Sequence, residues 1–576
     1  MDVTTESRPP ASPGCPPRPS STTQAELGFV RQPMVRWLDP RQLVDTTVRI
    51  VLSGIFGSYA DKREVQALIP GKVPDRSQAP ELWVDYVADL GDGWNSTYTV
   101  ARLLALEELG VGWDGRVHAT RRGRILVMGG DQVYPVPNRA DYENRMLGPY
   151  KAAMPCAQES PPELFAIPGS HDWYDGLVNF TSVFCRGHWI GGWSTQQSRS
   201  YFAVKLPHGW WLWGIDIQFG AYIDEAQLEY FSEVAERQVE AGDRIILCMA
   251  KEVEGGRDPA EIYSDRNLEY FERQIVQPSG GRVVLYLKSG RHHYCRYEEE
   301  GGASQHITAG GGGAFLHPTH HLPDHRDLPR EGAKASYRRA VAFPSAKDSK
   351  RLRRRLWLLP LRNPGFAALL GGVQVLLAFM LGLHRDDRHV SLGVDDMGRA
   401  LWESPTAFVL ILTVLVLLAA MVRFAHDATG AARLLLGVAH SVVQLATLAG
   451  FLVAASRVSS ALGLDGVASL VAFLVTLFLL GGAGGTLGMA GYLWASNCLG
   501  FHGNEAYAPL RVMDFKNFLR LHIGADGVLT LYPIGIDRVC RKWRVCPDGP
   551  AHAPWFDPAE PDVEVRLIEE PLRFAG

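Results

Sequence analysis

Acidic and histidine side chains stand directly behind glycine-containing turns at two points of this chain. The first block, residues 128–131, ends in Asp131, and the second, residues 167–172, contains His171 and Asp172. Each block follows an apolar run typical of a buried strand. Glycine lets the backbone bend sharply and approach an ion or a phosphate closely. The two blocks therefore predict a site for hard metal ions and phosphate at the ends of neighbouring strands.

Further candidates of the same chemistry flank these blocks. Asp89 and Asp92 share one turn on the N-terminal side, and Arg291, His292 and His293 follow an apolar run on the C-terminal side. In such a constellation two metal ions about 3.5–4 Å apart bind a phosphate, activate a water and stabilise the leaving oxygen. Asp oxygens together with His nitrogens suit Mn, Fe or Zn. The sequence thus predicts metal-assisted chemistry on a phosphate ester.

On these motifs the chain resembles the calcineurin-like metallophosphoesterases, in a membrane-anchored bacterial branch, over roughly residues 84–321. That family carries, in order, DxH, GDxxD or GDxxN, GNHD or GNHE, a lone histidine after a strand, and GHxH. The resemblance implies an αββα sandwich that hydrolyses phosphate esters. It also implies that His171 protonates the leaving oxygen, that Asp172 orients His171, and that Asp131 bridges the metals.

The resemblance leaves the first metal site with most of its ligands. Asp89 and Asp131 remain, and one of His292 and His293 is the last ligand, because two registers fit the final motif. The histidine of the first motif is missing, and Asp92 is the candidate that replaces it.

The second metal site is depleted by the same comparison. Ser170 stands at the asparagine position, Lys251 lies where the lone histidine is expected, and Arg291 replaces the first histidine of the last motif. A serine hydroxyl is a poor ligand, and fixed cations repel a metal ion while holding a phosphate. We therefore expect one divalent ion (Mn, Fe or Zn) rather than two, with these three residues binding phosphate.

The elements that must position these residues alternate between strands and helices, which predicts a mixed α/β domain over residues 30–323. The strand candidates are residues 124–128, 164–167, 201–206, 210–217, 244–249, 282–287 and 306–309. The helix candidates are residues 97–108, 139–154 and 225–241.

The last third of the chain is strongly apolar. A bilayer core needs about 20 apolar residues per helix, so four transmembrane helices are expected between residues 366 and 495. Their candidate stretches are residues 366–383, 406–424, 432–455 and 467–495. The basic run at residues 350–355 precedes the first stretch, and basic flanks stay cytoplasmic. This predicts a multi-pass membrane protein whose soluble domain and termini are cytoplasmic.

The remaining segments complete the expected organisation. Residues 1–29 are rich in Pro, Ser and Thr and predict a disordered tail. Residues 324–365 read as a polar, basic linker, and residues 496–576 are expected to pack on the soluble domain, with a hairpin turn at Asp526. Eight dispersed cysteines without a CxxC pair fit a reducing compartment and argue against a zinc knuckle.

Two functions from different classes fit this pattern. The first is a membrane-anchored phosphoesterase with reduced activity that hydrolyses a phosphorylated small molecule or another phosphoester. The alternative is a catalytically degenerate sensor of phosphate or nucleotide. The lipid bilayer is a partner in both, and a net charge of −4 gives no indication of nucleic acid. A transporter is disfavoured because Gln374, His440 and Gln444 are the notable polar groups of the apolar stretches.

Overall fold

The computed structural model of the chain describes residues 14–56, 66, 69, 71–217, 223–250, 259–330, 333–380, 407–425, 427–559 and 563–575. The chain forms two compact units. The first, here called the head unit, comprises residues 1–35, 46–346 and 512–576. The second, here called the helical unit, comprises residues 36–45 and 347–511.

The head unit contains two large sheets in its described part. The first has eleven strands, in the order β3 (Arg116–Arg121), β2 (Glu108–Trp113), β20 (Val565–Leu567), β17 (Leu529–Ile536), β16 (Lys516–Ile523), β1 (Leu82–Val87), β4 (Ile125–Met128), β5 (Glu163–Ala166), β7 (Trp193–Thr195) and β6 (Trp189–Ile190), with β21 (Leu572–Phe574) paired to β17. The second has eight strands, in the order β14 (His325–Arg330), β15 (Ala333–Phe343), β12 (Tyr294–Glu299), β13 (Gln305–Ala309), β11 (Arg282–Lys288), β10 (Arg244–Met249), β9 (Trp210–Ile215) and β8 (Phe202–Lys205). A small ribbon pairs β18 (Trp543–Val545) with β19 (Phe556–Pro558).

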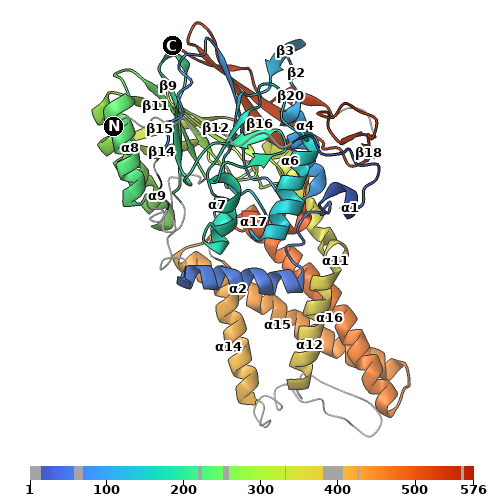
Figure 1. Cartoon of the computed structure of the whole chain (residues 1–576). Helices are drawn as coiled ribbons and strands as arrows, with labels where there is room; N and C mark the ends of the chain where they lie inside the picture. Colours follow the sequence, from blue (N-terminus) through green and yellow to red (C-terminus); the bar gives the residue numbers. More distant parts are fainter. Residues whose placement is uncertain are drawn as a thin grey trace. The chain divides into compact units, whose positions relative to one another are not determined.

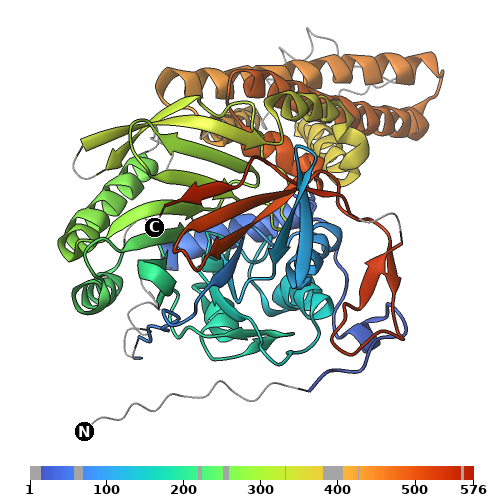
Figure 2. The same cartoon turned by 90° about the horizontal axis from the view of Figure 1, so that it is seen from above.

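The two sheets face each other across a shared apolar core. Val84 and Val127 from the first sheet and Leu212 and Ile246 from the second belong to one buried cluster. Helices α4 (Trp94–Ala105), α6 (Gly148–Ala153) and α7 (Val178–Phe184) cover the outer face of the first sheet. Helices α8 (Glu225–Gln238) and α9 (Pro259–Phe271) cover the outer face of the second. The prediction of a mixed α/β fold is confirmed, and its layers run helix, sheet, sheet, helix (Figures 1 and 2).

Strand β9 shows why this sequence forms a central strand. All six of its residues are buried, and β10 lies parallel to it. A strand covered on both faces reads as a continuous apolar run. Trp211 and Trp213 pack under the outer helices, whereas Trp210 and Leu212 point into the core between the sheets.

Short helices complete the chain of the head unit. They are α1 (Gln24–Leu27), α5 (Arg139–Asp141), the π-turns at Tyr142–Leu147 and Glu272–Val276, and the 3₁₀ turns at Asp172–Asp175, Pro207–Gly209 and Gln277–Ser279. Helix α2 (Pro40–Phe56) crosses the boundary between the two units along the chain.

The expected linker at residues 324–365 is structured instead. It carries the β14–β15 hairpin, then α10 (Ala346–Arg353), a 3₁₀ turn at Arg354–Leu358 and α11 (Leu359–Arg362). In the sequence, basic residues obscure the alternating polar and apolar pattern of β15. Its side chains Tyr337 and Phe343 are nevertheless buried. The C-terminal segment joins the first sheet directly, because β16 pairs antiparallel with β1. Figure 2 shows these C-terminal strands in red beside strands from the first part of the chain in blue.

The helical unit contains α12 (Pro364–Met380), α14 (Ala407–Phe424), α15 (Gly430–Ala461), α16 (Gly466–Cys498) and α17 (Gly503–Tyr507), followed by a 3₁₀ turn at Ala508–Leu510 (Figure 1). Among the described residues, α15 and α16 are long and apolar enough to cross a membrane. The pair formed by residues 346–362 and α12, bent by 63°, adds a third span if it crosses as one.

The prediction of four transmembrane helices is therefore wrong for the described part of the chain, where two helices qualify and three at most. The apolar part of α14, Ile411–Phe424, is too short. Pro364 interrupts the helix before α12 because proline lacks a backbone N–H. Residues 381–406, where part of the first and second apolar stretches was expected, lie outside the described residues.

One pair of cysteines differs from the expectation of reduced thiols. Cys15 and Cys156 form a disulfide between Cα atoms 4.9 Å apart, across 141 residues of sequence. The bond ties the N-terminal segment to the region just before β5. Their distance along the chain gave no signal for this pairing.

Candidate metal and phosphate site

The predicted site residues follow neighbouring parallel strands. Asp89 comes after β1, Asp131 after β4, and His171 after β5, and the three strands pair in parallel in that order. Their carboxyl ends therefore share one edge of the first sheet. His292 lies between β11 and β12 of the second sheet. The two sheets thus bring Asp89 and His292, which are far apart in the sequence, to one site around Tyr134.

The hydroxyl of Tyr134 lies at the centre of this group. Its oxygen is 3.2 Å from Asp89 Oδ1, 3.3 Å from Asp131 Oδ2 and 2.9 Å from His292 Nε2. All four side chains are buried. Sequence reasoning missed Tyr134, although it stands three residues after Asp131 in the same turn. One phenol proton serves one acceptor at a time, so three acceptors converge on a single donor.

A hydrogen bond to the backbone fixes the orientation of the His292 ring. Its Nδ1 donates to the carbonyl oxygen of Phe315 at 2.7 Å, which leaves Nε2 as the atom directed at Tyr134. Asp92 supports this arrangement because its Oδ2 accepts the backbone N–H of Phe315 at 3.1 Å. Its Oδ1 accepts the N–H of Val35 at 2.7 Å. Asp92, expected as a metal ligand, thus binds backbone on both oxygens.

Asp89 and Asp131 have an unusual backbone conformation and are closely packed in the site. Both are in the left-handed region, with φ of 57° and 49°, a conformation unusual for residues other than glycine. Neighbouring glycines make room for their carboxylates. A Cβ on Gly169 would lie 2.1 Å from Asp131 Oδ1, and one on Gly310 would lie 2.0 Å from Asp89 Oδ2. Close approach of the chain, rather than a special turn, explains glycine at these two positions.

The electrostatics of the site reflect burial and neighbouring charges. Burial, and then the neighbouring Asp131 carboxylate, raise the pKa of Asp89 well above its usual value. Burial, and then Lys516, hold the pKa of His292 well below its usual value, so this imidazole is neutral. Burial also lowers the pKa of Lys516 to about 8, while the acids Asp92, Asp514 and Asp89 act in the opposite direction. Lys516, whose Nζ donates to Ala314 O at 2.5 Å, is a second residue that sequence reasoning missed.

His171 lies against the same centre. Its ring is 4.4 Å from the Tyr134 ring, and its backbone N–H donates to Asp131 Oδ1 at 2.8 Å. Its Nδ1 donates to the carbonyl oxygen of Pro135 at 2.9 Å. In the structure Pro135 therefore provides the contact that orients this ring, the role expected for Asp172.

Asp172 instead holds the turn after β5. Its carboxylate accepts the Tyr142 hydroxyl at 2.7 Å and the Gly169 N–H at 2.9 Å. Burial, and then the charge of Asp131, raise its pKa to about 8. With these contacts, Asp172 acts as a residue that positions the turn after β5.

The expected phosphate-binding residues are less completely placed. Ser170 is exposed beside His171, and Arg291 is half-buried beside His292. His293 is buried next to them. Lys251 lies outside the described residues.

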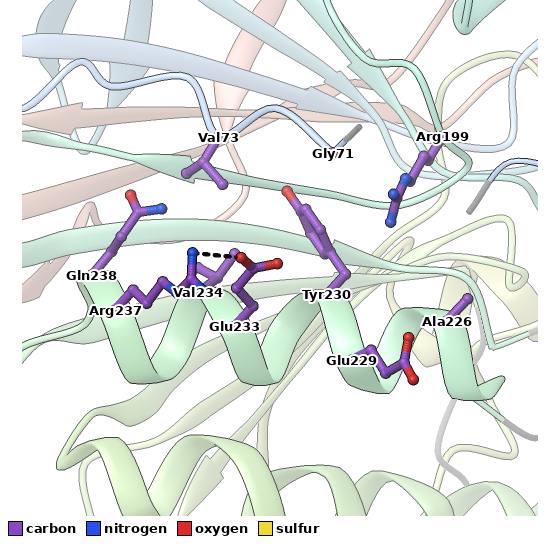
Figure 3. Close-up of a pocket in the computed structure, with 10 residues that line it drawn as sticks. All are labelled: Gly71, Val73, Arg199, Ala226, Glu229, Tyr230, Glu233, Val234, Arg237 and Gln238. Carbon is purple, nitrogen blue, oxygen red and sulfur yellow. Dashed lines mark ion pairs between the residues drawn. The ribbon is translucent and has the colours of Figure 1, made fainter. Parts of the chain in front are cut away.

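A separate pocket lies elsewhere in the head unit. It has a volume of about 240 Å³ and is lined on one side by α8, with Tyr230, Glu233 and Arg237, and on the other by Gly71, Val73 and Arg199. Figure 3 shows the ion pair between Arg237 and Glu233, which measures 2.8 Å. None of the predicted site residues lines this pocket.

Comparisons with known proteins give weak likenesses. The chain matches no family model and no curated relative. Among solved structures it is similar to GAP50, the anchor in the inner membrane complex of Plasmodium, with 15% identity, 46% of this chain and 78% of that chain covered, and a TM-score of 0.30. It is similar to PhoD with 10% identity, 42% and 60% coverage and a TM-score of 0.27. It is similar to a purple acid phosphatase from yellow lupin (Lupinus luteus) seeds with 13% identity, 46% and 48% coverage and a TM-score of 0.26.

Proposed function

We propose that the head unit is a phosphoesterase-type enzyme that holds one metal ion between Asp89, Asp131, Tyr134 and His292. One observation carries the proposal: two carboxyl oxygens and one imidazole nitrogen converge on the Tyr134 hydroxyl. A cation at that point satisfies all of these atoms together.

The donor atoms fit such an ion. Two carboxylates and a phenol oxygen are hard ligands, and an imidazole adds a borderline nitrogen, a set that suits Mn, Fe or Zn. The contact from His292 Nδ1 to a backbone carbonyl is typical of metal-binding histidines. Burial, and then the charges of Asp131 and Asp89, raise the pKa of Tyr134 far above its usual value, so the phenol keeps its proton until an ion binds. As a phenolate ligand Tyr134 would release that proton on binding. The ion would supply Lewis acidity toward a phosphate oxygen and a water.

The chain's own groups supply the rest of the chemistry. His171 keeps its Nδ1–H on Pro135 O, so its imidazolium form would donate the Nε2 proton to the leaving oxygen of a phosphate ester and become the neutral ring. Arg291 binds the phosphate oxygens, assisted by the exposed hydroxyl of Ser170 and by Lys251. Because the second metal position has lost its neutral ligands, we expect reduced turnover on a phosphorylated small molecule.

The test measures metal content and hydrolysis of an aryl phosphate by the full chain in detergent. Asp131→Asn should lose the bound ion and the activity together. Glu108→Gln, an exposed acid on β2, is the matched control and should behave as wild type. Activity that survives Asp131→Asn would refute the proposed enzyme.

A degenerate sensor remains the second candidate, favoured by Ser170 and Arg291 at positions where the resembled family binds a second metal. The triple change Ser170→Asn, Lys251→His and Arg291→His separates the two. If the wild type is a weak enzyme, this variant gains metal and turnover together. If the site is a sensor, the wild type binds inorganic phosphate without turnover, and the variant loses that binding.

We further propose that the chain is a multi-pass membrane protein with both termini in the cytoplasm. Helices α15 and α16 supply two spans, and the basic residues of α10 and the turn after it, which precede α12, are proposed to lie on the cytoplasmic side.

A further inference from the structure

A second group of metal-binding side chains lies in the helical unit, outside the site described above. Asp427 stands in the turn between α14 and α15, while His502 and Glu505 stand at the start of α17, just after α16. One ligand atom from each of the three lies within 4.8 Å of the other two. We propose that these residues bind one Zn²⁺ ion.

The buried imidazole of His502 carries the proposal. The side chain is fully buried, and among the described residues its Nδ1 has no hydrogen-bond partner. This nitrogen lies 3.8 Å from Glu505 Oε2, beyond a normal hydrogen bond. A buried ring nitrogen without a partner is unfavourable, because it has lost its hydrogen bond to water. It is directed at the carboxylate that would share the ion.

The opposite ring nitrogen of His502 is held in the manner of a metal ligand. Its Nε2 lies 2.7 Å from the hydroxyl of Tyr492 on α16. When Nε2–H donates to that oxygen, Nδ1 carries a lone pair directed toward a carboxylate. Such second contacts fix the tautomer and the ring orientation of zinc-binding histidines. The ring is further packed against Phe424, with centroids 4.9 Å apart.

The set of donors selects the ion. One nitrogen and two carboxylate oxygens suit Zn²⁺, which takes His nitrogen and Asp or Glu oxygen at about 2.0–2.2 Å. Ca²⁺ and Mg²⁺ prefer six or more oxygen ligands and are disfavoured. Ligand atoms around such an ion lie roughly 3–3.5 Å apart, so the three side chains must close by about 1 Å. Asp427 is exposed, which gives the ion a path from solvent.

The bound ion would connect two segments that the chain separates by 75 residues. Asp427 Oδ2 already accepts the backbone N–H of His502 at 2.9 Å. The ion would add a link between the α14–α15 turn and the end of α16. It would therefore stabilise the helical unit without taking part in chemistry in the head unit.

The experiment uses the full chain in detergent, with Asp131→Asn in every sample so that the head site does not contribute. Protein stripped with EDTA is dialysed against ZnCl₂, and bound zinc per chain is measured together with the unfolding temperature. Asp427→Asn and Glu505→Gln should each lower zinc affinity at least about tenfold and abolish the rise of the unfolding temperature with zinc. Asp465→Asn, an exposed acid in the α15–α16 turn, is the matched control and should keep both.

Tyr492→Phe tests the orienting contact and should also lower zinc affinity, with the visible spectrum of the Co²⁺-loaded protein changed. The proposal is overturned if Asp427→Asn and Glu505→Gln bind zinc as the control does. It is equally overturned if these variants lower stability by the same amount with and without zinc, since the cluster would then be an ion pair of a protonated His502.

Discussion

At the scale of single residues, Tyr134 connects the acids and the imidazole of the proposed head site. Its hydroxyl oxygen lies within hydrogen-bond distance of two carboxyl groups and an imidazole, and these contacts hold the acids together. Tyr134→Phe removes a ligand and the donor at once. We expect metal affinity to fall at least about tenfold and the metal-free protein to lose about 1–3 kcal/mol of unfolding free energy.

Titration calorimetry with Mn²⁺ and urea unfolding of the stripped protein measure the two effects. The control is Tyr174→Phe, which removes a hydroxyl from a ring that packs on His171. If both variants bind Mn²⁺ equally well, Tyr134 is not a ligand.

His306 gives a prediction about pH that is independent of the metal site. Burial, and then the cations Lys288, Arg330 and Arg326, lower its pKa well below the usual value. The folded protein thus keeps this imidazole neutral while the unfolded chain takes up a proton below about pH 6.5. Because the unfolded state then binds more protons, stability falls as the pH falls.

His306→Phe keeps the stacking on Tyr286, whose ring lies 4.0 Å away, and removes the titration. Between pH 6.5 and 5 the wild type should lose up to about 1.4 kcal/mol per pH unit relative to the variant. Urea unfolding followed by tryptophan fluorescence gives both profiles. Parallel profiles for the two proteins would contradict the prediction.

At the scale of elements, the turns after β4 and β5 must touch for the site to form. Gly169 permits this contact, since a Cβ there would collide with the backbone nitrogen and carboxylate of Asp131. Gly169→Ala should shift Asp131, lower metal affinity at least about tenfold and reduce stability by about 1–3 kcal/mol. Gly112→Ala is the control, because a Cβ at this strand position meets nothing within 4 Å. Metal analysis and thermal unfolding of both variants check the result, and equal metal content in the two would count against the contact.

Much of this element structure is predictable because central strands are locally apolar. The expected strands at 244–249 and 282–287 coincide with β10 and β11 almost residue for residue. Strand β1 was missed because Asp85 interrupts its apolar run. That carboxylate is buried against Arg520 of β16 at 3.1 Å, a partner 435 residues away. No local pattern carries such information.

The residues of the site likewise fall into those that the sequence identifies and those that it misses. Asp131 and His171 stand in turns that follow recognisable apolar strands, so residue type and position are enough to single them out. Asp89 follows the missed strand β1 and is singled out by its acidic, glycine-containing turn alone. Tyr134 and Lys516 were missed because a buried tyrosine or lysine is read as part of the core until its neighbours are known. The backbone contacts of Asp92 also depend on Val35 and Phe315, which lie far from it in sequence.

At the scale of the whole molecule, two features give opposite indications of compartment. By the positive-inside rule, the basic run in α10 and the following turn favours a cytoplasmic position for that flank of the helical unit. The Cys15–Cys156 disulfide is instead typical of an oxidising compartment. We give the charges more weight, because several basic residues act together on insertion, whereas two neighbouring thiols lie close in either redox state.

Because we give the charges more weight, we expect labelling of the cysteines to show a cytoplasmic head unit. In intact cells an impermeant maleimide should fail to label Cys546, which is half-buried and free, and should label it after the cells are opened. Rapid alkylation of the opened cells should find Cys15 and Cys156 reduced in most chains, and the disulfide should form only when the purified protein meets oxygen. Labelling of Cys546 in intact cells, together with a disulfide already present at lysis, would place the head unit on the outside. The substrate of the head site would then have to be a phosphate ester of that compartment.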